Sequence, residues 1–280
     1  PVSAFLKNVT WKKLQDVDAH RQIIFDAIVQ YRKMKNIGVV AVFDRGKFDK
    51  YAHFARIGEG SLGGKGRGLA FLDNVVKMHP EFNAFPGVTV QIPKTVVLCT
   101  DVFDQFMEQN NLYQIASSDE EILKHFLKAQ LPDSLIADFF TFFEATKSPI
   151  AIRSSSLLED SHYQPFAGIY STYLIPCLDD KYEMLRMLTS AIKSVYASVY
   201  YRDSKAYMTA TSNVIDQEKM AVILQEVVGK TYGDHYYPNI SGVLRSLNYY
   251  PIGDETAEEG IASLALGLGK YIVDGGLTLR

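Results

Sequence analysis

The chain of 280 residues has a formal net charge of −3, with 47% hydrophobic and 22% charged residues. This composition is typical of globular proteins, and the length allows one large domain or two smaller ones. A nearly neutral charge, without a basic run interleaved with aromatics, argues against nucleic acid as a partner. No apolar run reaches the ~18 residues of a membrane span and no signal-peptide pattern opens the chain, so we expect a cytoplasmic protein with no membrane partner.

The two cysteines, Cys99 and Cys177, favour the same compartment. They stand far apart and form no C-x-x-C pair, which argues against a disulfide framework and against a structural zinc site. We interpret both as small apolar residues. Because the chain begins at Pro1 without methionine and ends just after a glycine-rich stretch, we expect it to be a segment of a longer protein.

Apolar spacing in the first half predicts mainly helices, at residues 18–35, 69–78 and 132–146. Short strands are expected at 39–43, 88–92 and 95–99. Thr100 is expected to cap the helix that follows the last of these strands. Ser118 and Glu121 have the spacing of a capping box for another helix.

The pattern changes to strands at Pro149. Strands are expected at 150–153, 169–175, 220–228, 242–247 and 261–266, with one long helix at 184–199. The fold class is therefore α+β in two lobes, with a helix-rich first half and a mostly antiparallel sheet in the second. We expect an N-terminal α/β extension of unplaced role at 1–55, a first lobe at 56–148 and a second lobe at 149–280.

Residues 58–68 read GEGSLGGKGRG, with six glycines and two cations. Such a stretch predicts a loop, because glycine permits positive φ and a close approach to the backbone, while Lys65 adds a mobile charge. Phosphate is the natural ligand, and the start of the helix at 69–78 would reinforce the lysine. The spacing does not fit a P-loop, and Gly58, Gly60 and Gly63 satisfy the dinucleotide pattern G-x-G-x-x-G only formally, because more glycine rather than a helix follows. A flexible hinge with a solvated lysine is an equal alternative.

A second cationic stretch follows the strand at 150–153. Arg153 leads into Ser154, Ser155 and Ser156, and a forked cation beside hydroxyls suits phosphate oxygens. The alternative is that Arg153 pairs locally with an acidic residue at 159 or 160 and that the serines make a turn.

Several ordered blocks together resemble a known family. They are GGKG at 63–66, IRSSSLLED at 152–160, FAGxxxT at 166–172, MAVILQEVVG at 220–229, GVLRSLN at 242–248 and GLGKYIVDGG at 267–276. In order and separation they are similar to the N-terminal ATP-binding (PEP/pyruvate-binding) domain of the phosphoenolpyruvate synthase and pyruvate phosphate dikinase family. The resemblance covers about residues 56–280.

The resemblance implies an ATP-grasp-like fold with ATP between two lobes. It makes Lys65 and Arg153 the catalytic residues on the phosphates and Gln225 the residue at the adenine edge. The ATP-binding positions that it implies are Gly63, Gly64, Lys65, Gly66, Arg153, Ser154, Gly168, Thr172, Gln225, Glu226 and Val227. Its cofactors are ATP and Mg²⁺, with no metal ligand within this chain and the metal carboxylates expected beyond residue 280.

The implied activity is that of an ATP-dependent phosphotransferase of the dikinase type, which passes a phosphoryl group to a histidine in another domain. The implied partners are ATP and the phosphohistidine and pyruvate/PEP domains of the same longer protein, and the isolated segment is expected to be inactive. Arg245 and Tyr249 depart from the Phe and Pro of the family pattern. A non-catalytic nucleotide-sensing or interaction module, or a relative acting on a glucan or an antibiotic, therefore remains an alternative.

Overall fold

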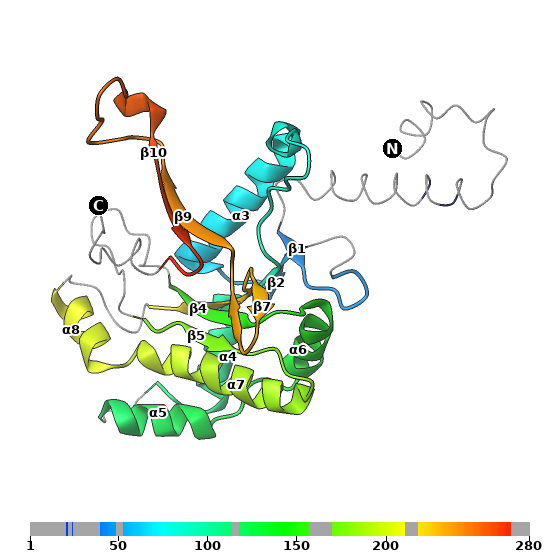
Figure 1. Ribbon diagram of the computed structural model, residues 1–280. Helices are drawn as coiled ribbons and strands as arrows, with labels where there is room; N and C mark the ends of the chain where they lie inside the picture. Colours follow the sequence, from blue (N-terminus) through cyan, green and yellow to red (C-terminus); the bar gives the residue numbers. More distant parts are fainter. Residues whose placement is uncertain are drawn as a thin grey trace. The chain divides into compact units, whose positions relative to one another are not determined.

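A computed structural model describes residues 21, 24, 40–48, 53–113, 118–156, 170–210 and 218–269 (Figure 1). The chain forms two compact units, Pro1–Glu226 and Val227–Arg280, which are taken separately below. Of the helix predicted at 18–35, only Arg21 and Ile24 are described, and both are helical. Gly168 lies outside the described residues.

The first unit is built on a six-stranded mixed sheet with the order β1-β2-β3-β6-β4-β5. In that order the strands are β1 (Ala41–Val42), β2 (Phe54–Ile57), β3 (Thr95–Leu98), β6 (Met220–Glu226), β4 (Ile150–Ser156) and β5 (Tyr173–Ile175). Strands β1, β2 and β3 run parallel, whereas β6 is antiparallel to both of its neighbours and β5 is antiparallel to β4. Residues from both sides of the predicted boundary at 148/149 thus share one sheet, and the two-lobe division stays a prediction.

Helices cover both faces of this sheet. They are α3 (Gly63–Met78), α4 (Thr100–Gln109), α5 (Asp119–Lys128), α6 (Ser134–Ala145), α7 (Lys181–Ser198) and α8 (Arg202–Ala210), with a 3₁₀ turn at Pro80–Asn83. Helix α3 lies on one face, and α7 packs on the other with α5 and α6 against it (Figure 1). We call these the α3 face and the α7 face.

The α7 face holds the large core. The apolar spacing of the helix predicted at 184–199 also predicts a buried stripe of six residues. Four of them are buried on α7, Leu185 is half-buried, and Val199 is buried at the C-cap; the four on α7 are Met184, Leu188, Ile192 and Val195. The side chain of Asp180 caps the helix by accepting hydrogen bonds from two backbone amides of its first turn. Rings from three helices meet over the stripe, with Phe106 5.4 Å from Tyr196 and 5.8 Å from Phe126. This packing holds the helices against the α7 face of the sheet.

Two local predictions in the first half are wrong. Residues 88–92 form no strand; Val88 and Val90 are exposed, and the amide of Val90 bonds to the Asn83 side chain rather than to a neighbouring strand. Thr100 begins α4 but does not cap it, because its hydroxyl accepts from the Ser61 amide. Ser118 does cap α5, accepting from the Glu121 amide at 3.4 Å, and α6 lies within the predicted 132–146.

The described part of the second unit, residues 227–269, contains two antiparallel ladders. Strand β7 (Lys230–Tyr232) pairs with β8 (His235–Tyr237), and β9 (Ile240–Arg245) pairs with β10 (Ile261–Leu266). A 3₁₀ turn at Ala257–Glu259 precedes β10 and begins with a Thr256–Glu259 capping box. The strand predicted at 261–266 is confirmed, and the strand predicted at 242–247 is present two residues earlier, at Ile240–Arg245. Gly233 has φ of 60° and makes the tight turn of the first ladder.

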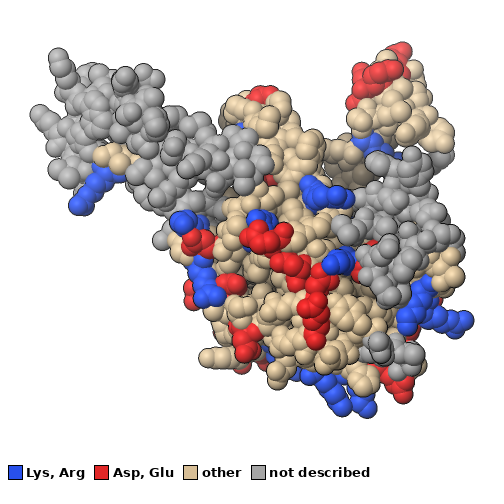
Figure 2. Space-filling model, turned by 180° about the vertical axis from the view of Figure 1, so that it is seen from behind, with Lys and Arg blue, Asp and Glu red and all other residues tan. Residues whose placement is uncertain are grey.

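The surface of the described residues carries both signs of charge. On the face drawn in Figure 2, lysine and arginine side chains alternate with aspartate and glutamate. Several charged side chains among the described residues form ion pairs, such as Arg45 with Asp138 at 2.6 Å. Among the described residues, no helix has both the length and the apolar content needed to cross a membrane.

Candidate functional site

The α3 face of the sheet is only thinly packed with apolar groups. Its small apolar cluster consists of Phe54, Ala70, Val97, Ala221 and Ile223. Side chains alternate between the two faces along a strand, and direct cross-strand partners lie on the same face. The partners of the cluster residues therefore show which polar side chains lie on the α3 face. Arg153 is paired with Ile223, Ser155 with Ala221, and Thr95 with Gln225. A row of hydrogen-bonding side chains therefore lies beside helix α3.

Glycines allow α3 to lie directly on strand β4. Gly63 has φ of +69°, and a Cβ there would stand 1.8 Å from the Ser155 carbonyl oxygen. The Ser155 hydroxyl joins the two elements, accepting from the Gly66 amide at 2.9 Å and donating to the Leu62 carbonyl at 2.7 Å. Larger residues at 63 would push the helix off the strand, so the glycines set the distance between Lys65 and β4.

The predicted loop at 58–68 is wrong in its second half, because α3 begins at Gly63. Three glycines of the first turn, Gly63, Gly64 and Gly66, are buried, so packing against the sheet outweighs their weak helix propensity. The glycine-rich stretch is thus part loop and part helix. The prediction that a helix begins at this stretch is confirmed, but α3 begins at Gly63 rather than at residue 69.

The remaining loop, 58–62, is tied to the start of α4. The Asp101 carboxylate accepts from the amides of Glu59 at 2.8 Å and Gly60 at 2.9 Å. The Ser61 amide donates to the Thr100 hydroxyl at 2.9 Å, and the Thr100 amide donates to the Ser61 carbonyl at 3.0 Å. Sequence reasoning missed this role of Asp101 and Thr100, because their partners stand about forty positions earlier in the chain.

Charge under this loop is balanced locally. Arg56 pairs with Glu59 at 2.9 Å, and this hydrogen bond raises the pKa of the guanidinium. Beside them, burial raises the pKa of the Cys99 thiol to about 11, with Asp101 adding to the effect and Arg56 opposing it. Cys99 is fully buried, in line with its interpretation as a small apolar residue.

Lys65 on α3 lies close to the segment of β4 that carries Arg153, although the two are distant in sequence. The Lys65 ammonium donates to the Ser154 hydroxyl at 3.3 Å, across 89 positions of sequence. Arg153, next to Ser154 on β4, donates from Nη1 to the Gln225 side-chain oxygen at 3.0 Å. The structure therefore brings together four predicted site residues, Lys65, Arg153, Ser154 and Gln225. The acidic residues proposed as local partners of Arg153 lie outside the described residues.

The predicted adenine-edge residues stand where the two units join in sequence. Gln225 and Glu226 end β6, and Val227 is the first residue of the second unit. The Glu226 amide donates to the Lys94 carbonyl at 2.8 Å, and its carboxylate accepts from Ser148 at 3.1 Å. The Val227 carbonyl accepts from the Tyr236 hydroxyl at 3.0 Å, within the second unit.

Thr172 comes directly before Tyr173, which pairs with Ile152 on β4. It is exposed at the edge of the sheet, and one residue beyond the Ile152–Tyr173 pair the same antiparallel register would place it opposite Arg153. Gly168, four residues earlier, is outside the described residues. Among the residues that the structure describes, no three His, Cys, Asp or Glu side chains stand close enough to hold a metal ion.

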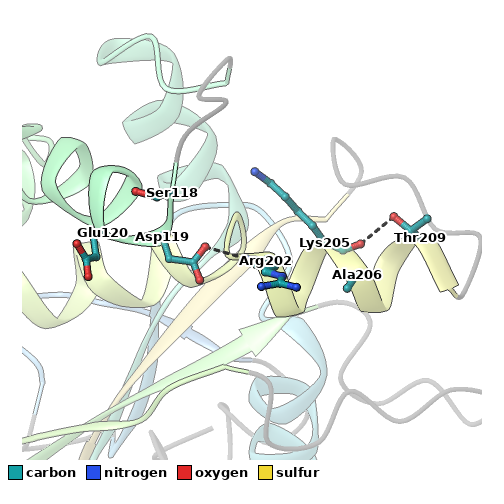
Figure 3. Close-up of a pocket in the computed structure, with 7 residues that line it drawn as sticks. All are labelled: Ser118, Asp119, Glu120, Arg202, Lys205, Ala206 and Thr209. Atoms are coloured by element: carbon teal, nitrogen blue, oxygen red, sulfur yellow. Dashed lines mark hydrogen bonds between the residues drawn. The ribbon is translucent and has the colours of Figure 1, made fainter.

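A separate cleft of about 870 Å³ lies between α5 and α8 (Figure 3). Ser118, Asp119 and Glu120 line one side, and Arg202 and Lys205 line the other. The Asp119 carboxylate accepts from the Arg202 amide at 2.9 Å. The two acidic and two basic side chains offset one another, so this cleft has no charge preference that would select a ligand.

Beside α3 the structure thus combines a lysine on the first turn of a helix with an arginine on the adjoining strand, at a spacing that glycines set. Cations of these two kinds suit an anion with several oxygens.

Comparison with known proteins identifies the family to which the chain belongs. The family described as pyruvate phosphate dikinase, AMP/ATP-binding domain, matches residues 59–279, and the chain belongs to this family. The predicted resemblance is thereby confirmed, and the mixed α and β structure with its mixed sheet is consistent with an ATP-grasp-like domain. The chain is also 27% identical over 188 residues to a Bacillus subtilis (strain 168) protein named "Uncharacterized phosphotransferase YvkC". The match covers 67% of this chain but only 20% of that relative.

Proposed function

We propose that this chain binds ATP and takes part in transferring a phosphoryl group from it. The observation that supports the proposal is the contact of Lys65 with Ser154, the neighbour of Arg153 in β4, which brings the two cationic segments together. Membership of an AMP/ATP-binding family supports the nucleotide, and the name of the Bacillus subtilis relative supports phosphotransfer.

The proposed roles follow from the chemistry of the side chains. Lys65 supplies a mobile point charge to the phosphates, and Arg153 supplies a planar fork that holds two oxygens at once. Such catalysis depends on positioning and on neutralising spread-out negative charge. The remaining proposed nucleotide contacts are Gly63, Gly64, Gly66 and Ser154 around the phosphates, Gly168 and Thr172 lining the nucleotide, and Gln225, Glu226 and Val227 at the adenine edge.

The acceptor in this proposal is a histidine in another domain of a longer protein, as in phosphoenolpyruvate synthase. A pyruvate/PEP domain would complete the dikinase reaction, and the location would be cytoplasmic. Mg²⁺ would neutralise phosphate charge, held by ATP oxygens and by carboxylates beyond residue 280. We further propose that ATP lies between lobes at 56–148 and 149–280, with 1–55 as an extension, and that the isolated segment is inactive.

A second candidate function is a nucleotide-sensing module without catalysis, or transfer to another acceptor such as a glucan or an antibiotic. The observation that favours it is Arg245, which departs from the family pattern and stands exposed at the end of β9. An exposed arginine there adds a recognition group without adding an element needed for phosphoryl transfer.

Ligand-dependent thermal unfolding tests the proposed nucleotide. ATP at about 100 times its Kd should contribute roughly 2.7 kcal/mol to stability and raise Tm. Adenine recognition predicts a smaller shift with GTP. No shift with millimolar ATP would overturn the ATP assignment. In the full-length protein, transfer of label from labelled ATP to a histidine would support the dikinase reading, whereas ATP binding without any labelled product would favour the sensor.

A further inference from the structure

Three buried or half-buried polar side chains form a chain of hydrogen bonds across the α3 face. The Thr95 hydroxyl donates to the Pro93 carbonyl at 2.8 Å. The Gln225 amide nitrogen donates to the same hydroxyl oxygen at 3.0 Å. The Gln225 amide oxygen then accepts from the Arg153 guanidinium at 3.0 Å. The chain crosses three adjacent strands, from β3 through β6 to β4.

The direction of each hydrogen bond in this chain is fixed by chemistry. A hydroxyl has one proton, and Thr95 gives its proton to a backbone carbonyl, so toward Gln225 it can only accept. The amide nitrogen of Gln225 must therefore face Thr95, and the amide oxygen must face Arg153. The arginine side chain has only hydrogen-bond donors, so its contact with Gln225 also requires the amide oxygen to face Arg153. The amide orientation thus agrees with both of its neighbours.

We propose that Thr95 is a positioning residue that acts through Gln225 to hold the Arg153 guanidinium for the phosphates of the nucleotide. The proposal rests on the proposed function of Arg153. It assigns the Gln225 amide to the arginine, where the family resemblance assigns Gln225 to the adenine edge. Thr95 itself is fully buried beneath this face and would touch no nucleotide.

Removing the Thr95 hydroxyl has a defined consequence. With valine at this position the Gln225 amide nitrogen is left buried without its acceptor, which is costly. Rotation of the amide would turn its nitrogen toward Arg153, placing donor against donor, and the guanidinium would leave its position. A strand-pairing role of Thr95 alone would instead lower stability without a specific effect on phosphate binding.

The test compares Thr95→Val with a matched control, Thr146→Val, by calorimetric titration of the full chain with ATP and with AMP. Thr146 is also buried, and within the described residues its hydroxyl has no hydrogen-bond partner. Thr95→Val should weaken ATP binding about tenfold, equivalent to about 1.4 kcal/mol. AMP binding should stay within about twofold, since the lost contact is to the outer phosphates. Thr146→Val should leave both affinities unchanged.

Two further variants separate positioning from simple destabilisation. Thr95→Ser keeps the hydroxyl and should restore ATP affinity to within about threefold of wild type. In an Arg153→Gln background, Thr95→Val should have less than a twofold further effect, because the group that it positions is already absent. The proposal is overturned if Thr95→Val weakens ATP and AMP equally, or if its full effect persists without Arg153.

A second readout remains valid without nucleotide. In the wild type, the Gln225 side-chain NH₂ should give an NMR signal protected from solvent exchange, and Thr95→Val but not Thr146→Val should abolish this protection. If the wild type does not bind ATP, the proposed function is wrong. If the Gln225 signal stays protected in Thr95→Val, the positioning role of Thr95 is wrong. If Thr95→Val does not fold, Gln225→Met replaces it: the same selective loss of ATP affinity is expected, and an equal loss for AMP would return Gln225 to the adenine edge.

Discussion

The two faces of the central sheet are packed in different ways. On the α7 face, β3, β4 and β6 contribute Val96, Ile152 and Leu224 to a continuous core filled by aromatic rings. On the α3 face, the same strands contribute Thr95, Arg153 and Gln225 next to a cluster of only five buried residues. Alternation along a strand therefore places core residues and the proposed binding residues on opposite faces of the same strands. The α7 face holds the larger core, and the α3 face carries the proposed nucleotide contacts Arg153 and Gln225.

The largest stability effect is expected on the α7 face. Phe106→Ala should lower the free energy of unfolding by about 3–5 kcal/mol, because it removes a fully buried ring from between Phe126 and Tyr196. The same substitution at Phe71, whose residue is 67% exposed on α3, should change stability by about 0.5 kcal/mol or less. Urea unfolding of both variants measures this difference. Equal losses would contradict the contrast between the two faces.

A smaller loss of stability, together with a loss of ATP affinity, is expected where α3 packs on β4. Gly63→Ala should cost about 2–4 kcal/mol, because φ is +69° and the new methyl group would meet the Ser155 carbonyl. ATP affinity should fall with it as Lys65 moves away from β4. Gly68→Ala is the matched control: nothing lies within 4 Å of its Cβ, so the helix should gain about 0.5–1 kcal/mol. Stabilisation by Gly63→Ala would show that the close packing is wrong.

On the α3 face itself, binding should change more than stability. Lys65→Met and Arg153→Gln should each weaken ATP binding at least about tenfold while leaving the free energy of unfolding within about 1 kcal/mol, since both side chains are only half-buried. Arg67→Gln, an exposed cation on the same helix, should leave affinity within about twofold. Calorimetry with parallel urea unfolding decides the matter. Unfolding by Arg153→Gln would mean that its bond to Gln225 is structural rather than poised for a ligand.

The sequence predicted the parts of the fold that depend on local periodicity. The α7 stripe, α6 and the strands at 95–98, 220–226 and 261–266 follow from apolar spacing and appear where expected. Residues 88–92 have the same alternation but form no strand, because no neighbouring strand pairs with them and their valines face outward. The start of α3 was missed because burial of its glycines against β4, a contact distant in sequence, overrides their propensity.

The candidate site divides in the same way. Lys65, Arg153 and Gln225 were predictable from residue chemistry and family motifs. Thr95 and Asp101 were not, because their roles depend on partners 130 and about forty positions away, and each residue alone is unremarkable in sequence. Sheet register is the missing information: only the direct pairing of β3 with β6 places Thr95 opposite Gln225.

The smallest expected effect concerns the loop at 58–62, which Asp101 binds near the buried Cys99 thiol and which we expect to shield that thiol. Burial raises the pKa of the Cys99 thiol to about 11, so at pH 8 only roughly one thiol in a thousand is ionised. Iodoacetamide should therefore modify the exposed Cys177 quickly and Cys99 very slowly.

Because the native state holds the Cys99 proton more tightly than the unfolded chain, the thiol favours folding below pH 9 and loses this contribution as the pH rises toward 11. Asp101→Ala removes the acceptor of the Glu59 and Gly60 amides, so the loop should open and Cys99 should be alkylated several-fold faster. Asp203→Ala, on the distant helix α8, should not change the rate. If Cys99 in the wild type reacts as fast as Cys177, or if Asp101→Ala leaves the Cys99 rate unchanged, the expected shielding of Cys99 by the Asp101-bound loop is wrong.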